Sequence, residues 1–143
     1  MCPTWQGRVV RGTPEVNFDG NPHTFGTFFE SAMASDGGIY GDMSFLRGCD
    51  GGGKITATDG SDMTRGCVAD LLNGAPESAQ ATKDTGSRIL DQVIGDKSNE
   101  AAKDWELSKC DPNMVWIDPN NNGGPVMASQ NGRLEFVFYK GRA

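Results

Sequence analysis

The stretch Gly37–Gly60 constrains the fold more than any other part of the chain. Glycine recurs throughout it, yet apolar residues recur as well, Ile39, Met43 and Ile55 among them. A flexible linker lacks such apolar residues, so the mixture predicts two short strands joined by a tight glycine-rich turn.

Within this stretch, Gly48–Lys54 has the G-x-x-x-x-G-K spacing of a phosphate-binding loop. Such a loop requires Ser or Thr next, to hold magnesium, and then a helix whose N-terminus faces the phosphates. The next residue here is Ile55, and the sequence KITAT predicts a strand. We therefore interpret Gly48–Lys54 as a structural turn and expect no nucleotide or other cofactor.

The composition favours one β-rich domain over residues 1–143. A chain of 143 residues is long enough to bury a core, and its 20 glycines, spread along the chain, predict many turns. The net charge of −6 disfavours nucleic acid as a partner. No apolar run reaches the ~18 residues of a membrane span. We expect a monomer.

Four cysteines, Cys2, Cys49, Cys67 and Cys110, lie too far apart in sequence for the usual zinc ligand pairs. They favour two disulfides in a secreted, extracellular protein, and four buried thiols in a cytosolic protein are the alternative. Four cysteines allow three pairings, of which we prefer Cys49–Cys67 with Cys2–Cys110. Met1 directly precedes Cys2, as in a mature secreted chain given a start codon.

Short apolar or alternating runs, separated by turn residues, predict strands in both halves of the chain. These strands are expected within Cys2–Val16 and at Thr24–Glu30, Ile39–Arg47, Lys54–Thr58, Met114–Ile117 and Leu134–Tyr139.

The middle of the chain has helical spacing instead. We predict short helices around Val68–Leu72 and Ile89–Ile94, ended by Gly74 and Gly95, and a third that begins at the N-cap Ser98. The predicted fold is a mainly β or α+β antiparallel β-sandwich, with a helical insertion around residues 67–108.

The loop Asp118-Pro-Asn120-Asn-Asn122-Gly matches the first half of a calcium-binding loop, but its twelfth position is Ser129 rather than Glu. A solvated hairpin loop is the preferred interpretation, with a weak calcium site as the alternative. The single histidine, His23, lies in a turn and is interpreted as a surface or packing residue.

Two carboxylates suffice for glycoside hydrolysis, and Asp42, Asp50 and Asp59 are the candidate catalytic acids. With 19 acidic residues in the chain, such pairs arise easily, so structural roles are favoured. Three tryptophans could stack on sugars but more often fill cores; they are Trp5, Trp105 and Trp116.

The segment from Ile39 to Gly48, IYGDMSFLRG, resembles the D-F-Y-D-V-S-L-V-D-G segment of thaumatin-like proteins, and the preceding TFGTFFE resembles one of their strands. The resemblance implies a β-sandwich with an acidic cleft for β-glucan. It assigns Asp42 to one cleft acid, while Arg47 and Thr27 stand where the other acids would be. That pattern implies a binding face without an intact catalytic cleft.

The end of the chain, SQNGRLEFVFYKGRA after Cys110, resembles the closing strand of KP4-like fungal killer toxins. That family packs helices against an antiparallel sheet, so it implies an α/β-sandwich as the alternative fold. Both families consist of small secreted proteins that act between organisms.

We therefore expect a secreted fungal effector or defence protein that binds a cell-wall polysaccharide or a host extracellular protein. The binding residues predicted for it are Tyr40, Asp42, Arg47 and Trp5. A binding protein is favoured over an enzyme. A weak β-glucan hydrolase and a killer-toxin-like inhibitor of cells are the alternatives.

Overall fold

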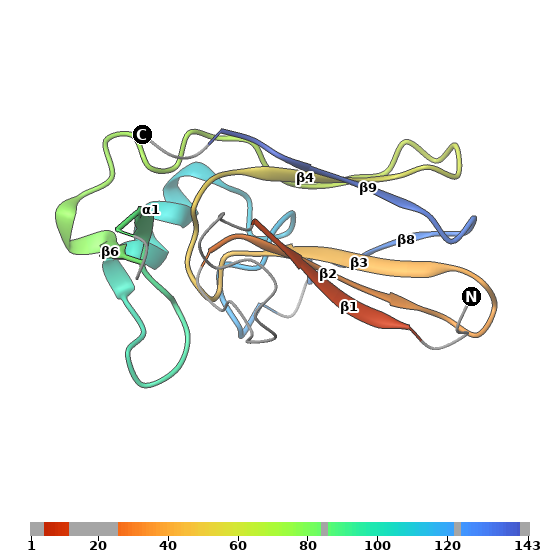
Figure 1. Cartoon of the computed structure of the whole chain (residues 1–143), viewed down its shortest axis with the longest axis horizontal. Helices are drawn as coiled ribbons and strands as arrows, with labels where there is room; N and C mark the ends of the chain where they lie inside the picture. The colour runs from red at the N-terminus through yellow and green to blue at the C-terminus, as the bar shows by residue number, and fades with distance from the viewer. Residues whose placement is uncertain (1–4, 12–25, 84–85, 122–123, 141–143) are drawn as a thin grey trace.

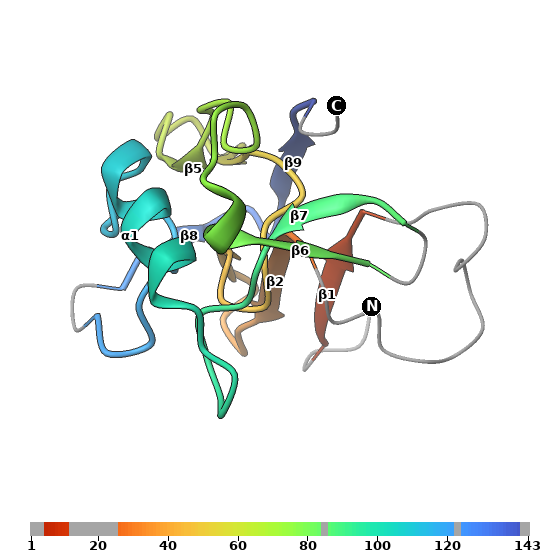
Figure 2. The same cartoon turned by 90° about the vertical axis from the view of Figure 1, so that its left-hand side faces the viewer.

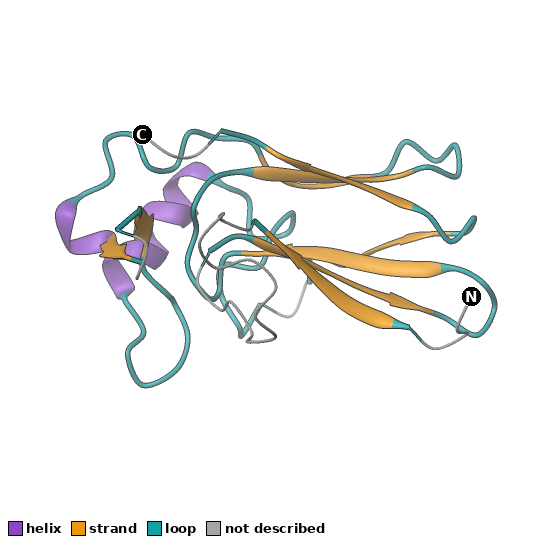
Figure 3. Ribbon diagram, viewed as in Figure 1, coloured by secondary structure: helices purple, strands orange, loops and turns teal. Residues whose placement is uncertain are grey.

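The computed structural model describes residues 5–11, 26–83, 86–121 and 124–140. Two antiparallel sheets lie face to face, and a small helical region with a two-stranded hairpin closes one end (Figures 1 and 3). The elements are β1 (Gln6–Val10), β2 (Phe28–Met33), β3 (Ile39–Ser44), β4 (Gly53–Ala57), β5 (Thr64–Cys67), η1 (Glu77–Ala79), β6 (Gln80–Thr82), β7 (Arg88–Leu90), α1 (Glu100–Lys109), β8 (Met127–Ser129) and β9 (Leu134–Phe138).

The four-stranded sheet has the order β1-β2-β3-β8, and the three-stranded sheet has the order β5-β4-β9. Phe29 on β2 packs against Phe136 and Phe138 of β9, with ring centroids 4.8 and 4.9 Å apart. These contacts place Phe29 between the two sheets. Because side chains alternate along a strand, the neighbours of Phe29 on β2 point to the opposite, outer face of the four-stranded sheet.

The predicted β-sandwich with a helical insertion is confirmed, and along β9 the alternating residues Leu134, Phe136 and Phe138 pack against the core. The glycine-rich turn joins β3 to β4, which lie in different sheets, so it is a crossover rather than a hairpin (Figure 1). Gly48 and Gly51 have φ values of 97° and 145°, which only glycine adopts readily. No helix follows Lys54, as expected for a structural turn.

Two of the three predicted helices are wrong. Val68–Leu72 is irregular with two bends, and Ile89 and Leu90 belong to strand β7, which pairs with β6. Most of their apolar residues are buried, namely Leu71, Ile89, Leu90 and Val93, whereas Val68 is exposed, so burial without regular helix explains most of the spacing. The third helix is confirmed as α1, although its N-cap is Asn99 rather than Ser98.

Strand predictions were correct in place for β1, β2, β3, β4 and β9 and wrong for Met114–Ile117. Only Trp116 of that segment makes a bridge, to Ser44 at the end of β3. Strands β5 and β8 were missed: both are short, and Gly66 and Ser129 give them weak strand propensity.

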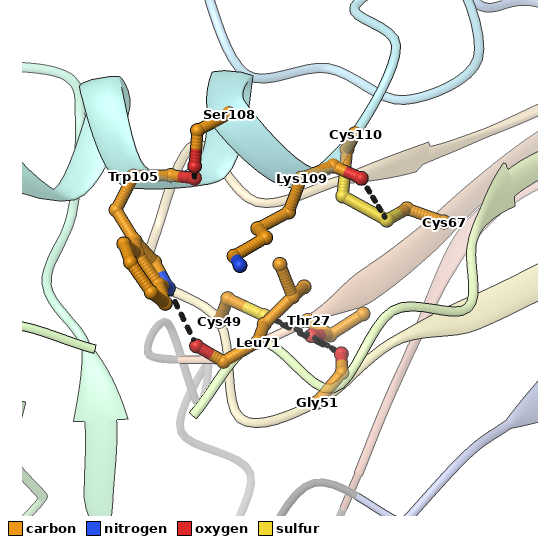
Figure 4. The surroundings of a disulfide bond; sticks show 9 residues. All are labelled: Thr27, Cys49, Gly51, Cys67, Leu71, Trp105, Ser108, Lys109 and Cys110. Atoms are coloured by element: carbon orange, nitrogen blue, oxygen red, sulfur yellow. Dashed lines mark hydrogen bonds between the residues drawn. A yellow bond between two sulfur atoms is a disulfide. The ribbon is translucent and has the colours of Figure 1, made fainter. Parts of the chain in front are cut away.

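The predicted disulfide pairing is wrong where the structure tests it. Cys67, at the end of β5, is bonded to Cys110, which follows α1, across a Cα–Cα distance of 5.6 Å. Cys49 is a buried free thiol near the Thr27 hydroxyl and the Gly51 carbonyl. Figure 4 shows both sites. The predicted Cys49–Cys67 bond is therefore absent despite its short sequence separation. The predicted Cys2–Cys110 bond is also wrong, because Cys110 is bonded to Cys67; Cys2 itself lies outside the described residues.

The core lies between the sheets and continues beneath α1. At this end, Trp105 of α1 donates from its indole nitrogen to the Leu71 carbonyl, 2.8 Å away. Figure 2 shows α1 and the β6–β7 hairpin side by side at that end of the molecule. Among the described residues, no helix is long and apolar enough to cross a membrane.

Candidate functional site

Three charged side chains line up across the outer face of the four-stranded sheet. The strand register pairs Arg8 of β1 with Glu30 of β2, and Glu30 with Asp42 of β3. Side chains directly opposite on antiparallel strands have Cβ atoms about 4.5–5.5 Å apart. We call Arg8, Glu30 and Asp42 the charged row.

Arg8 and Glu30 form an ion pair at one end of the charged row. One guanidinium nitrogen of Arg8 lies 2.6 Å from Glu30 Oε1, and its Nε donates to the same oxygen. The Arg8 guanidinium also lies over the Phe28 ring, 4.2 Å from its centroid. Both charged side chains are about 40% exposed, so the pair is held in place on an accessible surface.

Asp42 lies at the other end of the row in a more shielded position. Burial, followed by the negative charge of Glu30, raises the pKa of Asp42 to about 6, while Trp116 and Arg8 lower it by less. Its Oδ1 atom is buried and has no hydrogen-bond partner in the part of the chain that the structure describes. Asp42 can therefore donate a proton below about pH 6 and accept hydrogen bonds above it.

An aromatic surface adjoins Asp42. Tyr40 is two residues before Asp42 on β3 and so shares its outer face, with 48% of the residue exposed. Trp116 lies beside the end of β3, and its ring packs near Gly124. The outer face thus combines an exposed phenol, a partly buried indole and the charged row.

Asp50, predicted as a second catalytic acid, has a structural role instead. It is 1% exposed, and its Oδ2 lies 2.9 Å from Lys83 Nζ. Its Oδ1 accepts from the Thr27 backbone and lies 3.9 Å from Arg11 Nε. These contacts fix the crossover turn, and they leave Asp50 buried, away from the open face of the sheet.

Asp59 is on the other sheet, in the loop between β4 and β5. Hydrogen bonds from Ser61 and from the Gln130 backbone lower its pKa to about 2. They tie this loop to the turn that follows β8. The structure therefore does not bring Asp59 together with Asp42 or Asp50.

The predicted binding residues separate into two groups. Tyr40 and Asp42 share the outer face, whereas Trp5 does not. The Trp5 ring lies against the Cβ position of Gly7, which pairs with Ser31 and so faces the same side as Phe29. Arg47 is exposed in the turn after β3, and its carbonyl accepts from Gly26.

The predicted calcium loop is closed by an ion pair. Lys103 Nζ lies 3.2 Å from Asp118 Oδ2, and the Asn120 backbone donates to Oδ1 of the same aspartate. These contacts lower the pKa of Asp118. A pocket of about 420 Å³ adjoins the pair, lined by residues that include Val93, Ser98 and Lys103.

The remaining metal and histidine predictions add no site. In the described part of the chain, no group of three or more acidic, cysteine or histidine side chains could hold a metal ion. Asn122 and His23 lie outside the described residues.

Arg8 and Glu30 were missed from the sequence. The signal was present, because Glu30 and Asp42 are equally far from the centre of the turn at Asp36, and a tight hairpin there pairs them. To predict that Arg8 lies beside Glu30, one must know the register in which β1 pairs with β2. The length of the connection between them, which includes residues 12–25, does not determine that register.

No protein-family model matches the chain, and the search of curated proteins found no match either.

Proposed function

We propose that the protein binds a cell-wall glycan on the outer face of the four-stranded sheet. The observation that carries this proposal is the exposed Tyr40 directly beside Asp42 and the Arg8–Glu30 pair. A sugar presents an apolar CH face and a rim of hydroxyl groups. An exposed phenol supports the CH face, and the charged row accepts and donates hydrogen bonds at the rim.

Local geometry supports the same ligand class. The Arg8 guanidinium is fixed by both Glu30 and Phe28, so little side-chain entropy is lost when a ligand binds to it.

The disulfide supports an extracellular setting for this activity, because such bonds persist in oxidising compartments. We propose that the protein is secreted and acts outside the cell as an effector or defence protein. A host extracellular protein is the second partner class, and an inhibitor of cells of the killer-toxin type is the third.

One observation favours a hydrolase as the second candidate function. Asp42 and Glu30 are direct neighbours on adjacent strands in different environments: Asp42 is shielded and has a raised pKa, while Glu30 is ion-paired with Arg8. An acid kept protonated beside an ionised carboxylate is the arrangement that retaining glycosidases use. In this alternative, Asp42 is the general acid and Glu30 the nucleophile.

A pull-down on insoluble β-1,3-glucan, cellulose and chitin tests the proposal, with reducing-sugar release measured in the same tubes. Retention without release supports the binding protein. Release that Asp42→Asn abolishes supports the hydrolase. Retention on none of the three contradicts glycan binding and leaves protein recognition or cell inhibition.

A further inference from the structure

A carboxyl group lies buried beneath α1, far from the charged row in sequence and fold. Glu106 is 0% exposed, and among the described residues neither of its carboxylate oxygens has a hydrogen-bond partner. Ala102, one turn earlier on the same face, is also fully buried. An ionised carboxylate without partners is very unfavourable in such surroundings, so Glu106 is neutral when α1 is docked.

No described group compensates the charge of an ionised Glu106, since burial is the sole cause of its raised pKa. In the crossover turn, burial raises the pKa of the Cys49 thiol, and the charge of a Glu106 carboxylate would raise it further. Asp50 in the same turn is paired with Lys83. From η1, Glu77 is exposed to solvent.

The described cations of α1 and β5 have other contacts. On α1, Lys109 lies over the Trp105 ring, 4.5 Å from its centroid, and Lys103 pairs with Asp118. On β5, a terminal guanidinium nitrogen of Arg65 donates to the Thr64 carbonyl, while its buried Nε has no hydrogen-bond partner among the described residues. Burial alone therefore sets the pKa of Glu106, and it raises that pKa well above the ordinary value of 4.5.

The disulfide limits how α1 can respond to ionisation of Glu106. Cys110 follows the helix directly, and its backbone N–H donates to the Glu106 carbonyl, 2.9 Å away. The bond to Cys67 anchors that end of α1 to β5 (Figure 4). Movement that carries Glu106 into water therefore pivots the rest of α1 about the disulfide.

We propose that Glu106 is a pH-sensitive latch, which holds α1 on the end of the sandwich while it is protonated and releases α1 as it ionises. This inference does not depend on glycan binding. The direction of the pH dependence follows from the raised pKa of Glu106 in the closed state. In the open state Glu106 loses its proton above about pH 4.5, whereas in the closed state it keeps the proton to a higher pH. Each further pH unit then raises the open-to-closed ratio about tenfold, until the pH reaches the pKa of the closed state.

Cys49 is a built-in reporter of this opening, because it is 0% exposed and belongs to the same buried cluster as Ala102 of α1. In a Cys2→Ser background, its labelling by dithiodipyridine is compared at pH 4.5, 6 and 7.5 with that of an unstructured cysteine peptide. The normalised rate is expected to rise at least tenfold from pH 4.5 to 7.5. In Glu106→Gln, which keeps the shape of the neutral acid, it is expected to stay flat.

Glu77→Gln is the matched control, since it removes an exposed carboxylate next to α1 and is expected to behave as the unaltered protein does. If Glu106→Gln fails to fold, Glu106→Leu provides a second neutral side chain. A normalised rate that rises equally with and without Glu106 overturns the latch, and so does a flat rate in the unaltered protein.

Discussion

Asp42 is shielded on one side and exposed to a like charge on the other, and both effects act in the same direction. Burial disfavours its ionised form, and the neighbouring carboxylate of Glu30 adds repulsion. Arg8 offsets only part of this, because its guanidinium is directed at Glu30. The protonation of Asp42 therefore depends on an adjacent strand as well as on its own.

We expect the Asp42 carboxyl to titrate at about pH 6 when followed by carbon NMR of labelled aspartate. In Glu30→Gln its pKa is expected to fall but to stay above 3.8, because the repelling charge is gone while burial, the larger cause, remains. The exposed Glu135→Gln, on the other sheet, is the control and is expected to leave the titration unchanged. A midpoint near 3.8 in the unaltered protein contradicts this account of the site.

The candidate site could be predicted from the sequence only in part. Tyr40 and Asp42 lie on one strand, where alternation alone places them on one face. Arg8 and Glu30 join them through strand pairing, which period-2 patterns do not fix. Asp50 looked equally suitable, because the sequence contains no sign that Lys83, 33 residues later, would pair with it.

At the scale of elements, α1 begins with a side-chain cap that also links two segments. Asn99 Oδ1 accepts from the Ala102 backbone, and its amide nitrogen donates to the Ser78 carbonyl and to Asp91. Ser98, by contrast, donates to the Val93 carbonyl and caps nothing. The start of α1 is thus fixed by three hydrogen bonds from one residue.

Replacing Asn99 with Ala is expected to lower the free energy of unfolding by about 1–2 kcal/mol, because the cap and both links are lost together. Asn99→Ser, which keeps a capping oxygen, is expected to recover part of the loss. Ser98→Ala is the matched control, with an expected cost of about 1 kcal/mol or less. Denaturant unfolding at pH 5 measures the free energy of unfolding of all three variants. Equal losses of stability in Asn99→Ala and Ser98→Ala would contradict the assignment of Asn99 as the N-cap.

Helices and strands could be predicted where the local sequence preference agrees with the way the segment packs in the fold. In α1, helix-forming residues, a cap and a buried face coincide, and β9 alternates because one side faces the core. Around Val68–Leu72 and Ile89–Ile94 the spacing was helical, but these short segments are held by packing and bridges to other parts of the chain. Tertiary contacts override propensity in such segments.

At the scale of the whole molecule, the Cys67–Cys110 disulfide ties the sandwich to its helical end. The Cys67–Cys110 bond closes a loop with a sequence separation of 43 residues, which includes η1, β6, β7 and α1. The sandwich follows from patterns of burial along the strands, whereas its strand order does not. The pairing of the cysteines depends on where β5 and the end of α1 meet, which no sequence spacing shows.

The double variant Cys67→Ala/Cys110→Ala is expected to be less stable by about 4 kcal/mol, because the unfolded chain regains the freedom of that loop. Thermal and denaturant unfolding measure the loss. Peptide mapping without reduction is expected to yield a linked Cys67–Cys110 fragment and an unmodified Cys49 peptide. A Cys49–Cys67 fragment would contradict the structure.

Glycan binding on the outer face is the central claim, and Tyr40 provides its most direct test. The dissociation constant for laminarin, a soluble β-1,3-glucan, is measured by calorimetry for the unaltered protein, for Tyr40→Ala and for Tyr139→Ala. Tyr139, after β9, is 37% exposed and away from the charged row, so it is a matched control. We predict at least tenfold weaker binding for Tyr40→Ala and unchanged binding for Tyr139→Ala. Equal binding by all three proteins, or none by the unaltered protein, contradicts the claim.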